Sequence, residues 1–528
     1  MTNGMSRRGI LKTGSVLGLG ASVAAVTPVH ALAQTSQRTK KGKYFWLNGD
    51  HHVHTLFSND GKYRVQDHVR QAIRYGVNWL VLTDHGNVAH SQLSTEQIVP
   101  LIDEVRKEFG DSILIYHGLE WNIPGAEHAT VFVAPGRDDV AVMKEVEARW
   151  DARVKGTRDG TAANEALALE GIRFMGEARA RKRVEDIIMI PNHPSRQGID
   201  SPHEIRAWIQ AAPDVVIGME GAPGHQAGGL PAPHVGSRAR GLYDGGPGTF
   251  SFKGYPTESY RTWGGFDWMT ATVGGVWDSL LAEGRLFSVT ATSDSHNVYL
   301  DTTTRGPGSD FDAKGRTEDP VYSGTVDLTE NDFWPGYYSR THVGAEKVSH
   351  ASVMQGLREG RVWVDHGCLI DAIDVSVADQ AKSATLGGKL ETKRGRKVTL
   401  TVSVTPASKP NFAGFIPELA RVDVILGKVT GPVTDADTIT APDTRVITQM
   451  PIKDLTLRNG TYTWTQEIET PFENFYVRLR GTDGKKSQPG FLGADIDPAG
   501  PAMDEIGNAD PWEDLWFYTN PVFVEVSK

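Results

Sequence analysis

Apolar segments that end in histidine or carboxylate residues recur along the first 300 residues of this chain. The first segment leads into Asp50-His51-His52-Val53-His54. Side chains alternate between the two faces of a β-strand, so His52 and His54 point the same way and can hold one divalent metal ion. Later apolar runs end in the same kinds of residue, at Thr83-Asp84-His85, Gly118-Leu119-Glu120-Trp121 and Ser293-Asp294-Ser295-His296. The pattern predicts a metal site built where strands stop.

Strand and helix patterns alternate between about residues 44 and 296, with seven strand candidates. Alternation over this length favours a parallel α/β barrel over an open sheet. The active site of such a barrel lies at the C-terminal ends of its strands. Most candidate ligands fall at these ends, and His128, at the start of the fourth strand, is the exception. The Gly- and Pro-rich residues 224–265 are interpreted as a long loop over the site.

The last third of the chain has a different pattern. From residue 369 onward, helical periodicity gives way to short alternating runs separated by Gly, Pro, Asn and Asp, which predicts an antiparallel β-sandwich without a ligand cluster. With 528 residues, two or three domains are expected. We expect a signal peptide over residues 1–33, a metal-dependent hydrolase barrel over 44–368 and a β-sandwich domain over 369–528.

The N-terminus has the form of an export signal. Ser6-Arg7-Arg8-Gly9-Ile10-Leu11-Lys12 resembles the twin-arginine signal, a weakly apolar stretch follows, and Ala31-Leu32-Ala33 has the small-x-small form of a cleavage site. The alternative is a cytosolic protein with a basic tail. Export predicts a periplasmic or secreted protein with no membrane anchor after cleavage. The single cysteine, Cys368, excludes a disulfide within one chain.

The charge balance limits the class of partner. The formal net charge is −10, and removal of the leader, with its basic residues Arg7, Arg8 and Lys12, makes it more negative. General nucleic-acid binding uses basic surfaces, so an acidic chain argues against it. A small-molecule phosphate ester is the expected substrate, and the sequence leaves the oligomeric state open.

The ordered motifs resemble those of the PHP family, named for polymerase and histidinol phosphatase. The resemblance covers roughly residues 44–296. It implies a distorted (β/α)7 barrel that holds up to three metal ions. By this resemblance the ligands are His52, His54, Glu120 and Asp294 for one metal, Asp60, His85 and His296 for a second, and Glu120, His128 and His193 for a third. Glu120 would bridge, since a carboxylate has two oxygens with which to contact two cations.

Three further residues are predicted to act near these ligands. His225, in the Gly221-Ala222-Pro223-Gly224-His225 loop, could contact the substrate or assist the leaving group. Arg196, three residues after His193, could bind a phosphate, against the alternative of a surface arginine. Asp84 is expected to orient the ligands around it. We count all three as candidate catalytic residues.

The expected function is a metal-dependent phosphoesterase, with a phosphodiester favoured over a monoester. Two or three divalent ions, manganese, zinc or iron, would bind, and a hydroxide that bridges two of them would attack phosphorus. One alternative is hydrolysis of a non-phosphate ester or an amide by the same metals. Another is a non-catalytic metal-binding scaffold that uses the β-sandwich.

Overall fold

The computed structural model describes residues 39–235, 238–469 and 473–527, so the predicted signal peptide lies outside the described residues. Within those ranges no helix has both the length and the apolar character needed to cross a membrane. The elements before the second half of the chain are β1 Thr39–Lys41, β2 Tyr44–Asp50, α1 Val65–Arg74, β3 Trp79–Leu82, α2 Thr95–Phe109, β4 Leu114–Asn122, β5 His128–Val133, α3 Asp139–Trp150, α4 Ala152–Lys155, α5 Ala162–Ala180, β6 Ile187–Pro191, α6 Pro202–Ala211, β7 Gly218–Ala222, α7 Trp268–Ala271, α8 Val276–Ala282 and β8 Ser288–Ala291.

The remaining elements are mostly strands. They are β9 Thr303–Thr304, α9 Phe311–Lys314, β10 Val321–Tyr322, β11 Ser339–Ala345, α10 His350–Arg358, β12 Val362–His366, β13 Ile370–Ala378, β14 Ser383–Ala384, β15 Lys389–Lys393, β16 Lys397–Pro406, β17 Arg421–Lys428, β18 Arg445–Pro451, β19 Tyr462–Glu469, β20 Phe475–Thr482, β21 Trp516–Thr519 and β22 Val522–Ser527. The expected mixed α/β class, with parallel strands in a large sheet, is confirmed.

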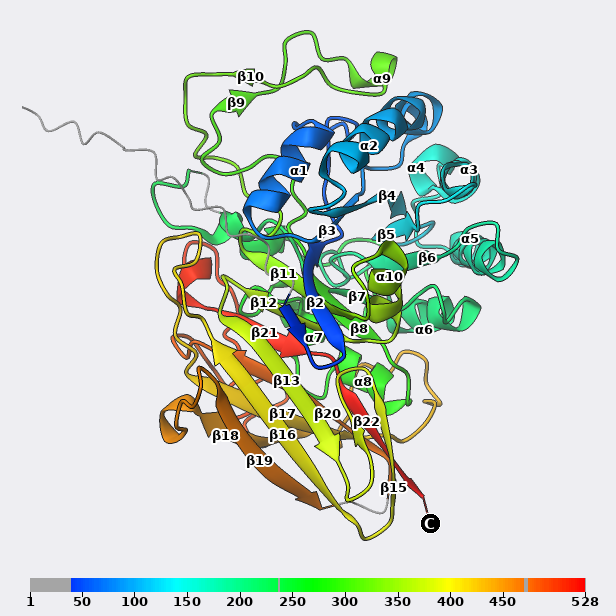
Figure 1. The fold of residues 1–528 in the computed structure, drawn as a ribbon. Coiled ribbons are helices and arrows are strands. Elements are labelled where there is room, and N and C mark those ends of the chain that lie inside the picture. Colours follow the sequence, from blue (N-terminus) through cyan, green and yellow to red (C-terminus); the bar gives the residue numbers. More distant parts are fainter. Residues whose placement is uncertain (1–38, 236–237, 470–472, 528) are drawn as a thin grey trace, which may run out of the picture.

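In the N-terminal half, the parallel strands have their carboxyl ends at one common edge. β2, β3 and β4 pair in parallel, and so do β7 and β8. A parallel bridge joins Met189 of β6 to Val216, and another joins Val53, after β2, to Ser295, after β8. Figure 1 shows α1 to α6 arranged along the outside of these strands. Loops that follow β2 and β8, far apart in sequence, therefore meet.

One strand differs from the all-parallel expectation. β5 runs antiparallel to both β4 and β6. Only residues 123–127 connect β4 to β5, and a parallel crossover needs a dozen or more residues. The chain therefore turns back in a hairpin, in which the Ile123 amide donates to the Glu127 carbonyl at 3.0 Å. As a result the first residue of β5, His128, lies at the same edge as the ends of the parallel strands.

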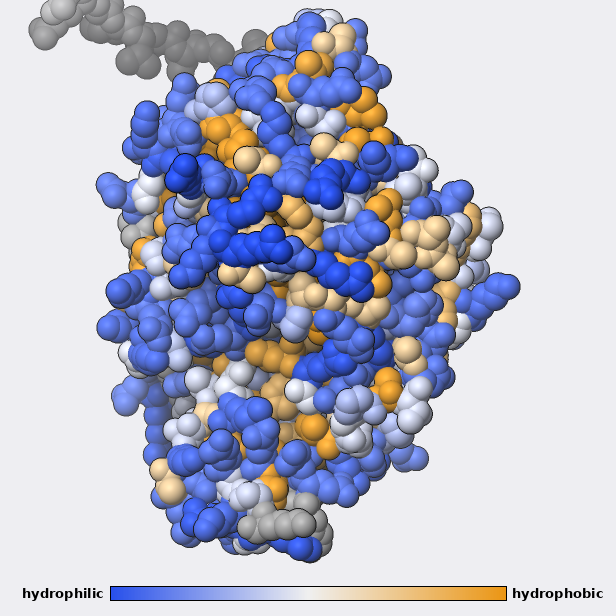
Figure 2. All heavy atoms as spheres, turned by 90° about the vertical axis from the view of Figure 1, so that its right-hand side faces the viewer, coloured by the Kyte–Doolittle hydropathy of each residue, from blue (hydrophilic) through white to orange (hydrophobic). Residues whose placement is uncertain are grey.

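Apolar residues pack on both sides of these strands. Leu80 and Leu82 of β3 share a buried cluster with Val69 of α1 and Ile98 of α2. On the face seen in Figure 2, which carries the outer helices, hydrophilic residues predominate and apolar residues form small separate groups. The helices thus bury one side and expose the other.

The C-terminal strands continue the sheet that contains β2. β11 pairs antiparallel with β2 and β12, and β12 pairs with β21, which leads to β20, β22 and β15. A separate four-stranded sheet runs in the order β14-β13-β16-β19. Its inward residues, such as Val375 and Val402, belong to one buried cluster with Val477 of β20 and Phe517 of β21. The barrel, the β-sandwich and the domain boundaries remain our interpretation of this arrangement.

Residues 297–338 form an insertion between the last ligand loop and β11. The Thr317 amide donates to the Leu56 carbonyl at 2.8 Å, and Lys62 Nζ donates to the Thr303 carbonyl at 3.1 Å. These contacts hold the insertion against the loop that connects β2 to α1. The insertion therefore forms part of the wall around the strand ends.

Candidate metal centre

The nine predicted ligands come together at the edge where the parallel strands end. Each is placed by a strand terminus or by a loop close to one. His52 and His54 follow β2, Asp60 lies in the loop before α1, His85 follows β3, Glu120 lies near the end of β4, His128 opens β5, His193 follows β6, and Asp294 and His296 follow β8. All but Asp60 and His128 are buried.

Glu120 and Asp294 face the two histidines that follow β2. His52 Nε2 lies 3.1 Å from Glu120 Oε1 and 3.1 Å from Asp294 Oδ1. His54 Nε2 lies 3.1 Å from Asp294 Oδ1 and 3.4 Å from Glu120 Oε2. His52, His54 and Glu120 can thus offer ligand atoms to one common point, and Asp294 Oδ1 contacts both of these histidines.

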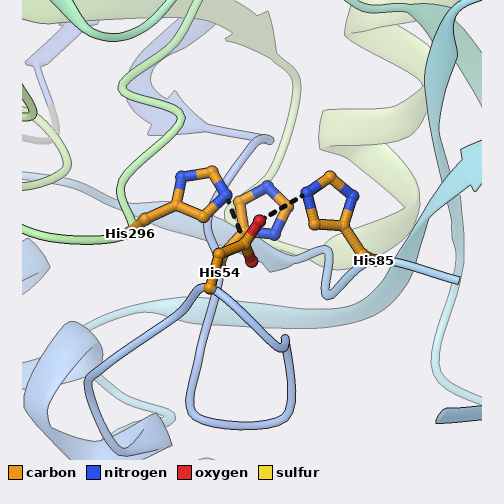
Figure 3. Close-up of side chains that lie close together, drawn as sticks. His54, His85 and His296 are labelled. Atoms are coloured by element: carbon orange, nitrogen blue, oxygen red, sulfur yellow. Dashed lines mark ion pairs between the residues drawn. The ribbon is translucent and has the colours of Figure 1, made fainter. Parts of the chain in front are cut away.

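A second group forms around Asp60. His85 Nε2 lies 3.1 Å from Asp60 Oδ2, and His296 Nε2 lies 3.6 Å from Asp60 Oδ1. Figure 3 shows the rings of His54, His85 and His296 close together. The His54 and His296 rings are stacked, with centroids 3.8 Å apart. This group matches the ligands expected for the second metal.

The third group uses the other side of Glu120. His128 Nδ1 lies 2.9 Å from Glu120 Oε1, and His193 Nε2 lies 3.4 Å from the same oxygen. His85 Nδ1 lies 2.6 Å from Glu120 Oε2. Glu120 therefore contacts every group, which is the geometry that a bridging carboxylate needs.

The donor atoms fit divalent metal ions. Several are buried without a hydrogen-bond partner in the described residues, including His54 Nε2, Glu120 Oε2, Asp60 Oδ1 and Asp294 Oδ1. Leaving such atoms unpaired is costly in a folded protein. Donors held about 2.1 Å from a metal lie about 3.0–3.4 Å apart along the edge of an octahedron or tetrahedron. The observed spacings are close to this range, and imidazole with carboxylate suits zinc, manganese or iron.

Local charges keep the carboxylates of the centre ionised. Burial by itself raises the pKa of the Glu120 carboxyl, but His85, His128 and His52 outweigh it, and the pKa lies well below its ordinary value. Asp294 behaves in the same way. Burial raises the pKa of its carboxyl, but neighbouring histidines, His52 foremost, lower it by more, and the pKa lies well below its ordinary value. Metal ligands must be deprotonated, so these carboxylates are ready to bind a metal near neutral pH. Despite burial, which acts in the opposite direction, carboxylates of the centre raise the pKa of His52 well above its ordinary value and that of His85 to about 10, so a bound metal must displace their protons.

Strained backbone accompanies the site. The backbone φ values of three residues lie in the left-handed region, which residues other than glycine rarely adopt. They are 32° for His193, 55° for His225 and 44° for Asp294. Such conformations cost roughly 1–3 kcal/mol each and cluster at functional sites. Three of them at one strand edge indicate that the loops are shaped for the side chains they carry.

Glu220, which sequence reasoning did not select, holds two ligands in place. It lies fully buried in the middle of β7. His52 Nδ1 lies 3.0 Å from Glu220 Oε1, and the His193 amide donates to Glu220 Oε2 at 2.6 Å. A carboxylate that accepts from a ligating histidine fixes the tautomer and the ring orientation. The signal was available, because Glu220 ends an apolar run in the same way as the ligands do.

Replacement of Glu220 with Gln is expected to weaken metal binding by about 10- to 100-fold while the fold is retained, because the His52 ring loses its charged acceptor. Competition with a fluorescent chelator measures the affinity. Glu177→Gln, which removes an exposed carboxylate on α5 that pairs with Arg181, is the matched control. Equal affinities in the two variants would contradict the assignment.

Asp84 does not reach the ligand side chains. Its carboxylate accepts from the Thr55 amide at 2.6 Å and from Thr55 Oγ1 at 2.8 Å, and its carbonyl accepts from the Glu120 amide at 3.1 Å. These contacts fix the loop after β2 against the end of β4. The geometry gives Asp84 a positioning role, and a direct part in catalysis stays a prediction.

His225 and Arg196 lie beside the centre. His225 Nε2 lies 2.8 Å from Asp294 Oδ2, and His225 Nδ1 lies 2.5 Å from Asp332 Oδ1. Asp332 belongs to the insertion and also accepts from the His296 amide at 2.6 Å. Its position in an irregular segment gave no sequence signal.

Among the described residues, Arg196 forms one weak ion pair, in which Nη2 lies 3.8 Å from Glu127 Oε2. Burial lowers the pKa of Arg196, but Glu127 and Asp294 raise it above its ordinary value. The guanidinium therefore sits in the field of the carboxylates of the centre, with most of its hydrogen-bonding capacity unused by Glu127.

Comparison with known proteins finds a similarity to one sequence family and to a solved structure. No curated protein is detectably similar to the chain. A solved two-domain protein from Bacteroides vulgatus, described as containing a predicted PHP-like metal-dependent phosphoesterase, shares 14% sequence identity with a TM-score of 0.34, over 88% of this chain and 97% of that chain. Residues 50–170 match the sequence model of the PHP domain. The candidate ligands from His52 to His128 lie inside this matched segment.

Proposed function

We propose that this protein is a metal-dependent phosphoesterase that prefers small phosphodiesters. The observation that carries the proposal is the convergence of six histidines and three carboxylates on one edge, with buried donor atoms that lack hydrogen-bond partners. The PHP-domain match supports the same class of reaction. Divalent ions held by these residues would supply positive charge for the nonbridging phosphate oxygens and lower the pKa of a bound water to about 7.

Hydrolysis adds one water across the bond between phosphorus and the leaving oxygen. In the proposed reaction, Arg196 donates hydrogen bonds to a nonbridging oxygen and so orients the phosphorus. His225 delivers a proton to the leaving oxygen, with Asp332 holding its Nδ1 side. Glu220 and Asp84 keep the surrounding loops in position.

Protein loaded with manganese, zinc or iron is expected to hydrolyse bis(p-nitrophenyl) phosphate faster than p-nitrophenyl phosphate. The diester carries a single negative charge, so the site has to accommodate less charge on the substrate than with the monoester. Release of p-nitrophenol measures both rates, and loss of activity with a chelator is the control. Faster monoester turnover would replace the diester preference with a phosphatase. Metal binding without cleavage of either compound would move the assignment to ester or amide hydrolysis, or to a metal-binding scaffold.

We also propose that the protein is exported through the twin-arginine route and acts on a small molecule outside the cytoplasm. The support is the motif at residues 6–12 with the small-x-small site at residues 31–33. The acidic composition disfavours nucleic acid as a substrate. Cell fractionation tests the location, and a protein confined to the cytoplasm would contradict export.

A further inference from the structure

The metal centre opens to solvent on the side of Asp60. The Asp60 side chain is 44% exposed, whereas His85, in the same group, is 8% exposed. Glu120, which contacts the other ring nitrogen of His85, is 1% exposed. A substrate that reaches the centre therefore meets the loop that carries Asp60 and the loop that carries His85.

A pocket lies against these two loops. Its volume is about 270 Å³. Asn59 precedes Asp60, and Asn87 lies two residues after His85, with its side chain 3.4 Å from the His85 carbonyl. The pocket is lined by Asn59, Asn87, Val88, Arg153, Phe311 and Asp312. Ligand pockets for drug-sized molecules are usually about 300–1,000 Å³, so this pocket suits a small group and not a polymer.

Arg153 is the cation of the pocket, and the fold fixes its location. Its amide donates to Asp151 Oδ1 at 2.9 Å, and Asp151 Oδ2 accepts from the Asn122 amide at 3.0 Å. A Cβ on Gly86 would lie 2.1 Å from Asp151 Oδ2, so the start of α4 packs directly against the residue after His85. Among the residues that the structure describes, the Arg153 guanidinium has no hydrogen bond or ion pair.

The other walls are apolar or neutral, with one exception. Val88 is 49% exposed, and Phe311 is half-buried. Asn59 and Asn87 offer uncharged amides. Asp312 is an exposed carboxylate, and among the described residues it does not approach Arg153 closely enough for an ion pair. Arg153 is thus the half-buried charged residue of the pocket, and Asp312 lies on its solvent side.

We propose that this pocket binds the leaving group of the substrate, and that the leaving group is small, has an apolar body and carries a negative charge that Arg153 recognises. Val88 and Phe311 would contact the body, while Arg153 would pair with the carboxylate, phosphate or sulfate at its end. This inference rests on the proposed phosphoesterase function, because the phosphoryl group of the substrate would lie at the metal centre while its leaving group lies in the pocket.

Binding of two non-hydrolysable probes tests the pocket without turnover. Calorimetry with the metal-loaded protein compares phenylphosphonate with 4-carboxyphenylphosphonate. We expect the carboxylated probe to bind about tenfold more tightly, since a hydrogen bond to a charged group contributes on that scale. Arg153→Gln should abolish the difference, and Arg153→Glu should reverse it. Arg149→Gln, at an exposed arginine on α3 that pairs with Glu145, is the matched control.

Turnover of two diesters, methyl phenyl phosphate and methyl 4-carboxyphenyl phosphate, then separates the two proposals. Hydrolysis of both without selectivity, unchanged in Arg153→Gln, would overturn the pocket and leave the phosphoesterase intact. No hydrolysis, together with Arg153-dependent selectivity in binding, would overturn the phosphoesterase and support the anion pocket. Asp312→Asn should raise the preference for the carboxylated probe, and a fall in that preference would contradict the assignment of charges.

Discussion

Replacement of Glu120 with Gln is expected to remove metal from the centre and to reduce phosphodiester hydrolysis by about a thousandfold or more. The change is nearly isosteric but converts an anionic bridge into a neutral amide with one oxygen. Five histidines contact the two oxygens of Glu120, and they are His52, His54, His85, His128 and His193. No other side chain in the described site reaches all three groups, so the loss should affect the whole centre.

Metal content by mass spectrometry and turnover of bis(p-nitrophenyl) phosphate measure the two effects separately. Glu177→Gln, at an exposed position on α5, controls for the loss of a carboxylate elsewhere. Near-normal metal content with near-normal activity in Glu120→Gln would contradict the bridging role. Full metal content with lost activity would assign Glu120 to the reaction and not to metal binding.

The convergence of the candidate ligands could be predicted because each depends on its own short segment. His52 and His54 alternate on one extended stretch, and Asp294 and His296 repeat that spacing after β8. Parallel strands end at a common edge, so local patterns were sufficient to bring these loops together. His128 looked like an exception, and the hairpin between β4 and β5 explains it, because an antiparallel strand begins where its parallel neighbours end.

The residues that support the ligands depend on contacts across the whole fold. Glu220 is 168 positions from His52, and Asp332 is 107 positions from His225. No local period specifies which carboxylate will reach which imidazole. The pairing of β12 with β21 is similar, because strand patterns predict that strands exist but not which partner each one takes. Fold class and ligands were therefore accessible, whereas strand order and supporting contacts were not.

Arg478→Ala is expected to lower the free energy of unfolding by about 3–5 kcal/mol, since it leaves a buried carboxylate without its cation. Arg478 lies on β20 and Asp278 on α8, and both side chains are fully buried. Arg478 Nε lies 2.8 Å from Asp278 Oδ1, and Nη2 lies 2.6 Å from Oδ2. The guanidinium also lies over the Trp277 ring, 4.4 Å from its centroid. This pair connects a helix of the metal-binding half to a strand of the C-terminal sheet.

Denaturant unfolding followed by tryptophan fluorescence measures the effect. Lys397→Ala breaks the exposed pair with Glu467, whose side chains are 74% and 62% exposed, and should cost less than about 1 kcal/mol. If the cost in Arg478→Ala arises from the unpaired Asp278 charge, adding Asp278→Asn should recover part of the stability, because an amide is cheaper to bury than an anion. A single variant within 1 kcal/mol of wild type would mean that α8 and β20 are held together by their apolar contacts alone. A double variant no more stable than Arg478→Ala would mean that lost packing against Trp277, and not charge, carries the effect.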